Sequence, residues 1–170
     1  LPMVYYHVWD NFPAPQFNAN FYNSNDVVAC ISKVTHEIVK AVAPEVESHY
    51  VPHAVNEVYF HPAKTDEEKQ TTESLRTRIT QGNTKKKIFF WNNRNARRKQ
   101  SGTLMWWFKE WLDKVGHDKA MLLMHTDPRD PHGQDLPHLI NHLGLNSGQV
   151  LLSTNKVPSE QLANMYRAAD

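Results

Sequence analysis

Short apolar runs alternate with helical patterns along this chain, and no other feature constrains the fold as strongly. Apolar residues at helical spacing predict helices over residues 33–42, 65–80, 101–115, 135–143 and 159–168. Strands that are separated by helices form βαβ units, and their strands pair in parallel. We therefore predict an α/β fold with a Rossmann-like parallel sheet and flanking helices. The predicted strands are Pro2–Tyr6, Val27–Ile31, Lys87–Trp91, Ala120–His125 and Val150–Ser153.

Local signals mark where the predicted helices begin and end. Ser32 and Ser101 are expected N-caps, because a serine hydroxyl can accept a hydrogen bond from a free main-chain N–H. Gly144 is expected to stop the helix that starts at Asp135. The helix after Ser101 is expected to bury Leu104, Trp107, Phe108, Trp111, Leu112 and Val115.

An irregular stretch with two prolines, Pro52 and Pro62, divides the sequence. It predicts an interdomain linker over residues 51–64. Residues 1–50 are then the tail of an N-terminal domain, and residues 65–170 form a C-terminal domain. The first residue is Leu1 rather than Met, and Asp170 follows directly on a helical pattern. We therefore expect a fold that is incomplete at both ends, cut from a longer parent protein.

The charge balance, the cysteine count and the length of the apolar stretches exclude several classes of protein. The chain has 19 Lys and Arg against 18 Asp and Glu, a net charge of +1, so the whole molecule is not a polyelectrolyte binder. Its single cysteine, Cys30, excludes an internal disulfide, fits a reducing compartment and is expected to be buried and unreactive. No apolar stretch approaches the roughly 20 residues of a membrane span. We expect a cytoplasmic protein without a transmembrane segment, and peripheral membrane contact stays open for the parent protein.

The strongest chemical signal is a basic turn between a strand and a helix. The apolar strand ends at Trp91, an asparagine-rich turn follows, and four cations precede the next helix. Ligands of open α/β sheets bind at the carboxyl ends of the strands, where helix N-termini, Arg and Lys favour anions. The sequence therefore predicts a phosphate-type anion at Arg94 and Lys99.

This turn resembles the "GR…KG" signature of family-4 GT-B glycosyltransferases. In that family the Arg and Lys hold the diphosphate of the nucleotide-sugar donor, so the resemblance assigns this role to Arg94 and Lys99. Asn93 and Gln100 stand where the family has glycine. Further segments are similar to the family in the same order along the chain. They are Pro2–His7, Asp26–Thr35, Tyr50–Asn56, Phe60–Pro62, Leu122–Thr126 and Ser159–Asp170.

The resemblance implies a GT-B glycosyltransferase that moves a sugar from a nucleotide-diphosphate sugar to a glycan, lipid or protein acceptor. It implies retention of anomeric configuration, with no metal and no cofactor. It makes His7 an active-site histidine and places Lys156 and Val157 in a nucleobase loop. The family's two glutamates would follow Asp170, so the isolated chain is expected to be inactive.

Other functions stay open. A polyanion or nucleic-acid binder could use a basic cluster over Lys85–Lys99, defined as Lys85, Lys86, Lys87, Arg94, Arg97, Arg98 and Lys99. Against it, Phe89, Phe90 and Trp91 lie in a strand that we expect to be buried, so we predict no nucleic-acid partner. A divalent metal at Asp127 and Asp130 is conceivable, but aspartates framed by prolines are more typical of turns. The last alternative is an α/β remnant with structural contacts only.

Overall fold

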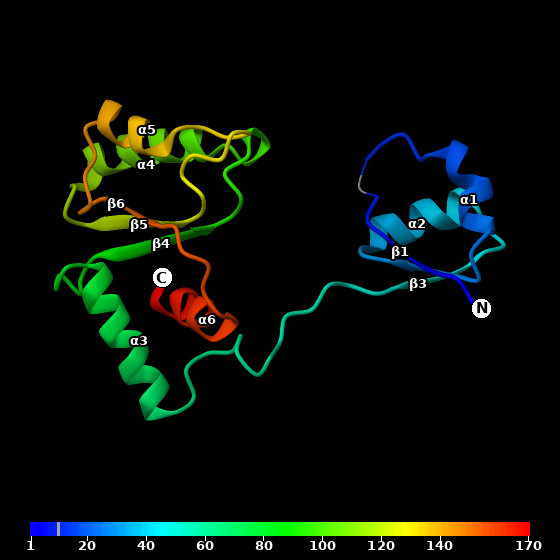
Figure 1. The fold of residues 1–170 in the computed structure, drawn as a ribbon, viewed down its shortest axis with the longest axis horizontal. Coiled ribbons are helices and arrows are strands. Elements are labelled where there is room, and N and C mark those ends of the chain that lie inside the picture. Colours follow the sequence, from blue (N-terminus) through cyan, green and yellow to red (C-terminus); the bar gives the residue numbers. More distant parts are fainter. Residues whose placement is uncertain (10) are drawn as a thin grey trace. The chain divides into compact units, whose positions relative to one another are not determined.

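The computed structural model describes residues 1–9 and 11–170 and divides the chain into two compact units, Leu1–Val55 (unit 1) and Asn56–Asp170 (unit 2) (Figure 1). Each unit contains one sheet of three parallel strands with flanking helices. This arrangement confirms the predicted α/β, Rossmann-like fold class.

The sheet of unit 1 has the order β1-β2-β3, formed by Val4–His7, Val27–Cys30 and Glu47–Tyr50. The helices α1 (Ala19–Asn23) and α2 (Lys33–Val42) lie on one side of it (Figure 1). The sequence did not predict β3, because its residues Glu-Ser-His-Tyr form no apolar run. It is a mostly exposed edge strand, held in parallel register with β2.

Local signals in unit 1 act as expected. The Ser32 hydroxyl accepts a hydrogen bond from the Thr35 N–H at 3.0 Å, which confirms the predicted cap of α2. Cys30 is fully buried, and this burial raises the pKa of its thiol. The thiol is therefore protonated and inert at neutral pH, as predicted. The core around it consists of Tyr22, Val28, Cys30, Ile38, Val39, Val42 and Ala43.

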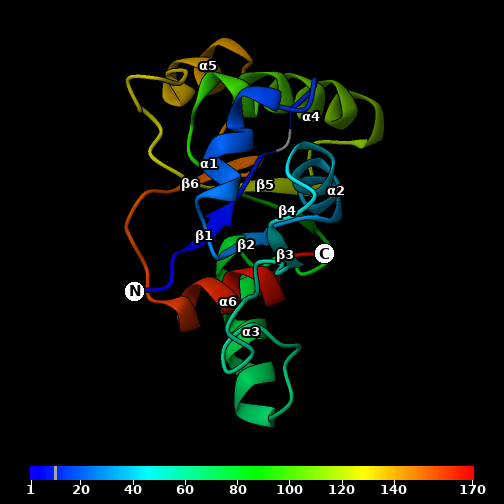
Figure 2. The same ribbon diagram turned by 90° about the vertical axis from the view of Figure 1, so that its right-hand side faces the viewer.

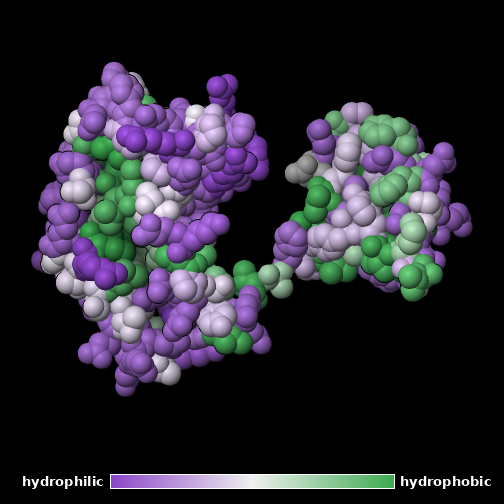
Figure 3. Space-filling view, in the orientation of Figure 1, coloured by the Kyte–Doolittle hydropathy of each residue, from purple (hydrophilic) through white to green (hydrophobic). Residues whose placement is uncertain are grey.

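The sheet of unit 2 has the order β4-β5-β6, formed by Lys87–Asn92, Ala120–His125 and Val150–Ser153. The helices α4 (Ser101–Val115) and α5 (Leu136–His142) cover one face, and α3 (Asp66–Ile79) and α6 (Ser159–Ala168) cover the other (Figures 1 and 2). A short 3-10 helix, Arg97–Lys99, precedes α4. Hydrophobic residues gather between the two helical layers (Figure 3).

The central strand β5 supplies side chains to both faces of this sheet. Leu122 and Met124 pack in the core beneath α4 and α5, whereas Met121 and Leu123 pack in the core beneath α3 and α6. This alternation follows from the two-residue period of a strand and explains why the run is continuously apolar. Among the described helices, none has the length and apolarity to cross a membrane.

The helices α3 and α5 begin close to residues 65 and 135, where the sequence predicts them. Thr65 and Glu68 form a capping box at the start of α3, and Asp135 caps α5. The expected cap at Ser101 is wrong. The N-cap of α4 is Gln100, which has left-handed backbone angles (φ 55°, ψ 37°), and the Ser101 hydroxyl instead donates to Asn95 Oδ1 at 2.7 Å.

The buried face of α4 differs from the predicted one. Trp107 is 65% exposed and Val115 is 39% exposed, whereas Met105, Phe108 and Leu112 are buried. The burial of Phe108 and Leu112 is therefore confirmed, whereas the inward positions predicted for Trp107 and Val115 are wrong. Met105 fills the core at a position where we expected Leu104 and Trp107 to point inward, and Leu104 is only partly buried.

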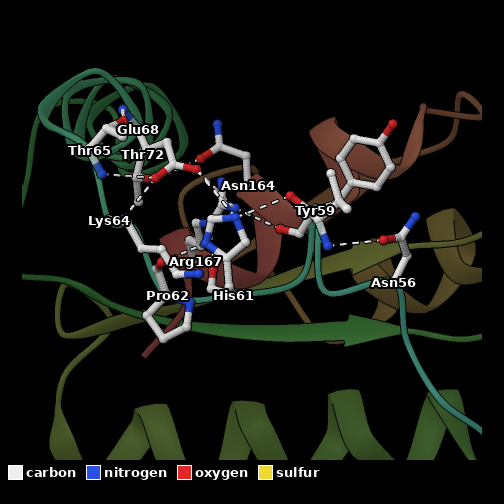
Figure 4. Close-up of polar contacts among 11 residues, drawn as sticks. Asn56, Tyr59, His61, Pro62, Lys64, Thr65, Glu68, Thr72, Asn164 and Arg167 are labelled. Carbon is white, nitrogen blue, oxygen red and sulfur yellow. Dashed lines mark hydrogen bonds and ion pairs between the residues drawn. The ribbon is translucent and has the colours of Figure 1, made fainter.

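Residues 56–64, part of the predicted linker, belong to unit 2 and pack against its helices α3 and α6 (Figure 4). Arg167 of α6 donates to the main-chain oxygens of Tyr59 at 2.6 Å and His61 at 2.8 Å. The Glu68 carboxylate accepts from the N–H groups of Lys64 and Thr65 at 2.7 and 3.0 Å. Side chains of α3 and α6 therefore hold the main chain of this segment against the rest of unit 2.

Asp170 joins the end of the chain to the start of β4. Its carboxylate pairs with Arg76 at 2.7 Å and Lys87 at 2.8 Å, and it accepts from the Ile88 N–H at 2.9 Å. Burial alone would raise the pKa of this carboxyl. The hydrogen bonds from Lys87, Ile88 and Arg76 outweigh burial and lower the pKa from 3.8 to about 2.

We predict that Asp170 stabilises unit 2 by about 2 kcal/mol at neutral pH, the free-energy equivalent of this pKa shift. Because the folded-state pKa is lowered, this stability is complete above pH 3.8 and is lost as the pH falls through about 2. Urea unfolding of Asp170→Asn and the unaltered chain, followed by tryptophan fluorescence, should show a difference at neutral pH that vanishes near pH 2. A difference that is independent of pH would contradict this assignment.

Candidate functional site

Three loops of unit 2 follow the carboxyl ends of its parallel strands and therefore meet at one edge of the sheet. Residues 93–100 follow β4, residues 126–135 follow β5, and residues 154–158 follow β6. These loops contain Arg94, Lys99, Lys156 and Val157, the four residues to which the resemblance assigns a role in binding the donor.

A bidentate ion pair joins the first two loops. Arg94 Nε donates to Asp130 Oδ2 at 2.6 Å, and Arg94 Nη2 donates to Asp130 Oδ1 at 3.2 Å. The Arg94 side chain is 62% exposed, whereas the Asp130 side chain is only 8% exposed. The carboxylate thus lies beneath the guanidinium, which faces solvent at the carboxyl edge of the sheet.

Electrostatics keeps both partners of this pair charged. The hydrogen bonds that Arg94 donates to Asp130, and the negative charge of that carboxylate, raise the pKa of Arg94. The hydrogen bond from Arg94, together with the N–H of His132, lowers the pKa of Asp130. The Asp130 carboxylate is therefore already paired with the Arg94 guanidinium. Asp127 belongs to a turn, where its Oδ1 accepts a hydrogen bond from the Arg129 N–H at 3.0 Å. Within residues 1–9 and 11–170, no cluster of His, Cys, Asp and Glu suits a metal ion.

Two residues that the sequence did not single out fix the geometry of these loops. The fully buried Asn95 donates to the Gln134 main-chain oxygen at 2.7 Å and accepts from the Ser101 hydroxyl. The Gln134 side chain accepts from the Gly102 N–H at 2.6 Å, at the start of α4. The Gly102 N–H, one of the helix N-terminal groups that we expected to face an anion, is therefore already bonded to Gln134. The sequence around Asn95 contains no pattern that predicts its hydrogen bond to Gln134, which is 39 residues away.

The two loops approach each other most closely at Gly133. A Cβ atom at this position would overlap the main-chain oxygen of Asn95 and lie 2.6 Å from its Cγ. The Arg97 N–H also donates to the His132 oxygen at 3.1 Å. Only glycine fits this contact, which holds the Asp130 loop against the Arg94 loop.

Lys99 has different surroundings from Arg94. It lines a groove of about 290 Å³ with Trp91, Gln100, Thr103, Leu104 and Trp107. Arg94 does not line this groove. The structure thus places both predicted anion ligands in one loop, but it shows no direct contact between them among the described residues.

His7 is buried in unit 1, at the carboxyl end of β1. It is 3% exposed, and its Nε2 forms a hydrogen bond of 2.7 Å with the hydroxyl of Tyr22. Burial lowers the pKa of His7, so its ring is neutral at pH 7. Among the described residues, its Nδ1 has no hydrogen-bond partner.

The two candidates after β6 differ in their surroundings. Lys156 is exposed, whereas Val157 is partly buried against the core beneath α3 and α6. Val157 also lines a cavity of about 1020 Å³ between these helices and the strands β5 and β6, together with Leu151 and Ser153. Both residues follow the same sheet edge as Arg94.

The basic cluster does not form one patch. Lys86 and Lys87 lie at the start of β4, and Arg94 to Lys99 lie beyond its end, so the six-residue strand separates them by roughly 20 Å. Lys86 is buried and donates to the Gly148 oxygen, and Lys87 pairs with Asp170. A single polyanion strand would therefore meet only part of this cluster.

One expectation used against nucleic-acid binding is wrong. Phe89 is 47% exposed rather than buried, because β4 is an edge strand of the described sheet. Its ring nevertheless packs edge-to-face on Phe108 and Trp111, with centroid separations of 5.9 and 5.6 Å. This packing leaves the Phe89 ring poorly placed to stack on a base, and the basic residues are divided between the two ends of β4.

Comparison with solved structures supports the fold. Sucrose-phosphate synthase from Thermosynechococcus elongatus matches with a TM-score of 0.62 and 19% identity, over 89% of this chain and 35% of that chain. The N-terminal domain of Candida albicans trehalose-6-phosphate phosphatase matches with a TM-score of 0.61 and 15% identity, over 86% and 38%. The chain thus spans little more than a third of the length of either structure.

At these identities the likeness shows the fold alone. No protein-family model matches the sequence, and no curated protein matches it significantly. The parallel sheets, their flanking helices and these neighbours together show an α/β, Rossmann-like fold of the GT-B type.

Proposed function

We propose that this chain is the donor-binding part of a glycosyltransferase that uses a nucleotide-diphosphate sugar. The observation that carries the proposal is Arg94, an exposed guanidinium fixed at the carboxyl edge of a parallel sheet. Lys99 follows five residues later in the same loop and supplies a second positive charge. The fold, which is shared with a sucrose-phosphate synthase, supports an enzyme that acts on sugars.

The chemistry of the site is electrostatic. When a sugar leaves its nucleotide, negative charge builds up on the oxygens of the diphosphate. A guanidinium binds two phosphate oxygens in a fixed plane, and an ammonium adds a compact charge beside it. Arg94 and Lys99 would stabilise the leaving diphosphate in this way without a metal.

The remaining candidates take supporting roles in this proposal. The nucleobase would lie against the loop of Lys156 and Val157, which follows β6, the opposite edge strand of the same sheet. His7 would act from the acceptor side, the role that the resemblance implies for it. Retention of configuration, the family-4 assignment and a cytoplasmic location belong to the same proposal.

Ligand-observed NMR with this polypeptide tests the donor site. The probes are UDP, GDP, ADP, inorganic diphosphate and a short single-stranded DNA. We expect one nucleoside diphosphate to bind selectively, and we expect Arg94→Ala combined with Lys99→Ala to abolish that binding. The matched control is Arg97→Ala combined with Arg98→Ala, which removes the same charge from exposed positions of the same loop.

Two outcomes would overturn the proposal. Equal losses in both double variants would show that only the charge of the loop matters. Binding of every polyanion, with log K falling linearly in log salt concentration, would favour the nucleic-acid alternative.

A further inference from the structure

The orientation of Arg94 is set by one carboxylate. Asp130 engages the Nε–H and one N–H of Nη2, which lie along one edge of the planar guanidinium. The N–H groups of Nη1 and the second hydrogen of Nη2 lie along the other edge. That edge belongs to a side chain that is 62% exposed, so a ligand can reach it while Asp130 stays in place.

Asp130 is itself held by its surroundings. Its Oδ1 accepts from the His132 N–H at 2.9 Å, and its main-chain oxygen accepts from the Gly133 N–H at 2.8 Å. The next residues contact the Arg94 loop through the bond from the Arg97 N–H to the His132 oxygen. The carboxylate therefore has a fixed position relative to the main chain that carries Arg94.

We propose that Asp130 is a positioning residue for the donor site, which holds Arg94 so that its free guanidinium edge binds a diphosphate. This inference rests on the proposed function, because it takes a diphosphate as the ligand of Arg94. An unrestrained arginine would lose its side-chain entropy on binding, and Asp130 removes that cost in advance. The Asp130 carboxylate also repels an anion. If it positions Arg94, its removal weakens diphosphate binding; if only its charge matters, its removal strengthens binding.

Asp130→Asn separates these two effects. The probe is inorganic diphosphate, titrated into the 170-residue chain by calorimetry. We expect Asp130→Asn to weaken binding by roughly two- to tenfold, the cost of ordering one long side chain, although it removes a negative charge. Asp127→Asn is the matched control. It removes the same charge from the same loop without touching Arg94, and it should leave binding unchanged or slightly tighter.

A second measurement uses the unaltered chain and does not depend on the folding of a variant. The Nε–H resonance of Arg94 should be visible and slow to exchange, and it should keep its shift when diphosphate binds to the other edge. An Nε–H that moves strongly or loses its protection on binding would show that the ligand displaces Asp130.

The outcomes distinguish this inference from the proposed function. If the unaltered chain binds diphosphate, but Asp130→Asn binds it equally well or more tightly, the positioning role is wrong and the donor site stands. If the unaltered chain does not bind diphosphate, both are wrong.

Discussion

Replacing Arg94 by alanine should slow transfer from the nucleotide-sugar donor by about 10²- to 10³-fold in the parent enzyme. Loss of one donor aimed at developing negative charge typically costs about 2.7–4 kcal/mol of transition-state stabilisation. Arg94 faces the carboxyl edge of the sheet with one guanidinium edge free, which is the geometry that such stabilisation requires. The measurement is the initial rate of transfer, with the donor both below and above saturation.

Arg97→Ala is the control for this prediction. Arg97 is an exposed cation in the same turn, and among residues 1–9 and 11–170 it forms hydrogen bonds through its main chain alone. Its loss should change the rate by less than about threefold, as expected for a screened surface charge. Similar losses from both substitutions would show that the loop acts through its total charge, and would exclude Arg94 as a specific ligand of the diphosphate.

Replacing Gly133 by alanine should destabilise unit 2 by about 3 kcal/mol and abolish diphosphate binding at the same time. The added Cβ overlaps the Asn95 main-chain oxygen, so the Asp130 loop must move away. Movement of this loop also breaks the bonds that Asn95 and Gln134 form between the two loops. Thermal unfolding and a diphosphate titration measure the two effects.

Gly144→Ala controls for the general cost of replacing a glycine. Gly144 has a positive φ of 67°, but a Cβ there would meet nothing within 4 Å. Its replacement should cost only about 1 kcal/mol of backbone strain and leave diphosphate binding intact. If Gly133→Ala behaved like Gly144→Ala, the close approach of the two loops would not matter for the site.

Sequence reasoning succeeded where one local pattern determines the structure. The apolar run Ala120–His125 is buried on both faces, and Ser32 caps α2 as predicted. It failed for β3, because an exposed edge strand needs no apolar residues and depends on pairing with β2. It also misplaced part of the inward face of α4, since four tryptophan and phenylalanine rings on one helix allow more than one inward face.

The candidate site shows the same limit. Arg94 and Lys99 were found because strand, turn, cations and helix follow one another directly in the sequence. The partner of Arg94, Asp130, is 36 residues away, and its loop was interpreted as a turn or a weak metal site. Only the parallel order of β4 and β5 brings the two loops to the same edge, and no local pattern specifies which side chains then meet.

The contacts of Arg167 have an evolutionary consequence. Its guanidinium donates to the main-chain oxygens of Tyr59 and His61, and every amino acid supplies such an oxygen. The residues at these positions can therefore be exchanged during divergence without loss of the attachment, whereas Arg167 cannot. Related chains should vary freely over residues 59–61 and retain arginine at position 167. This contact should therefore be visible as conservation in α6 and not in the segment that α6 holds.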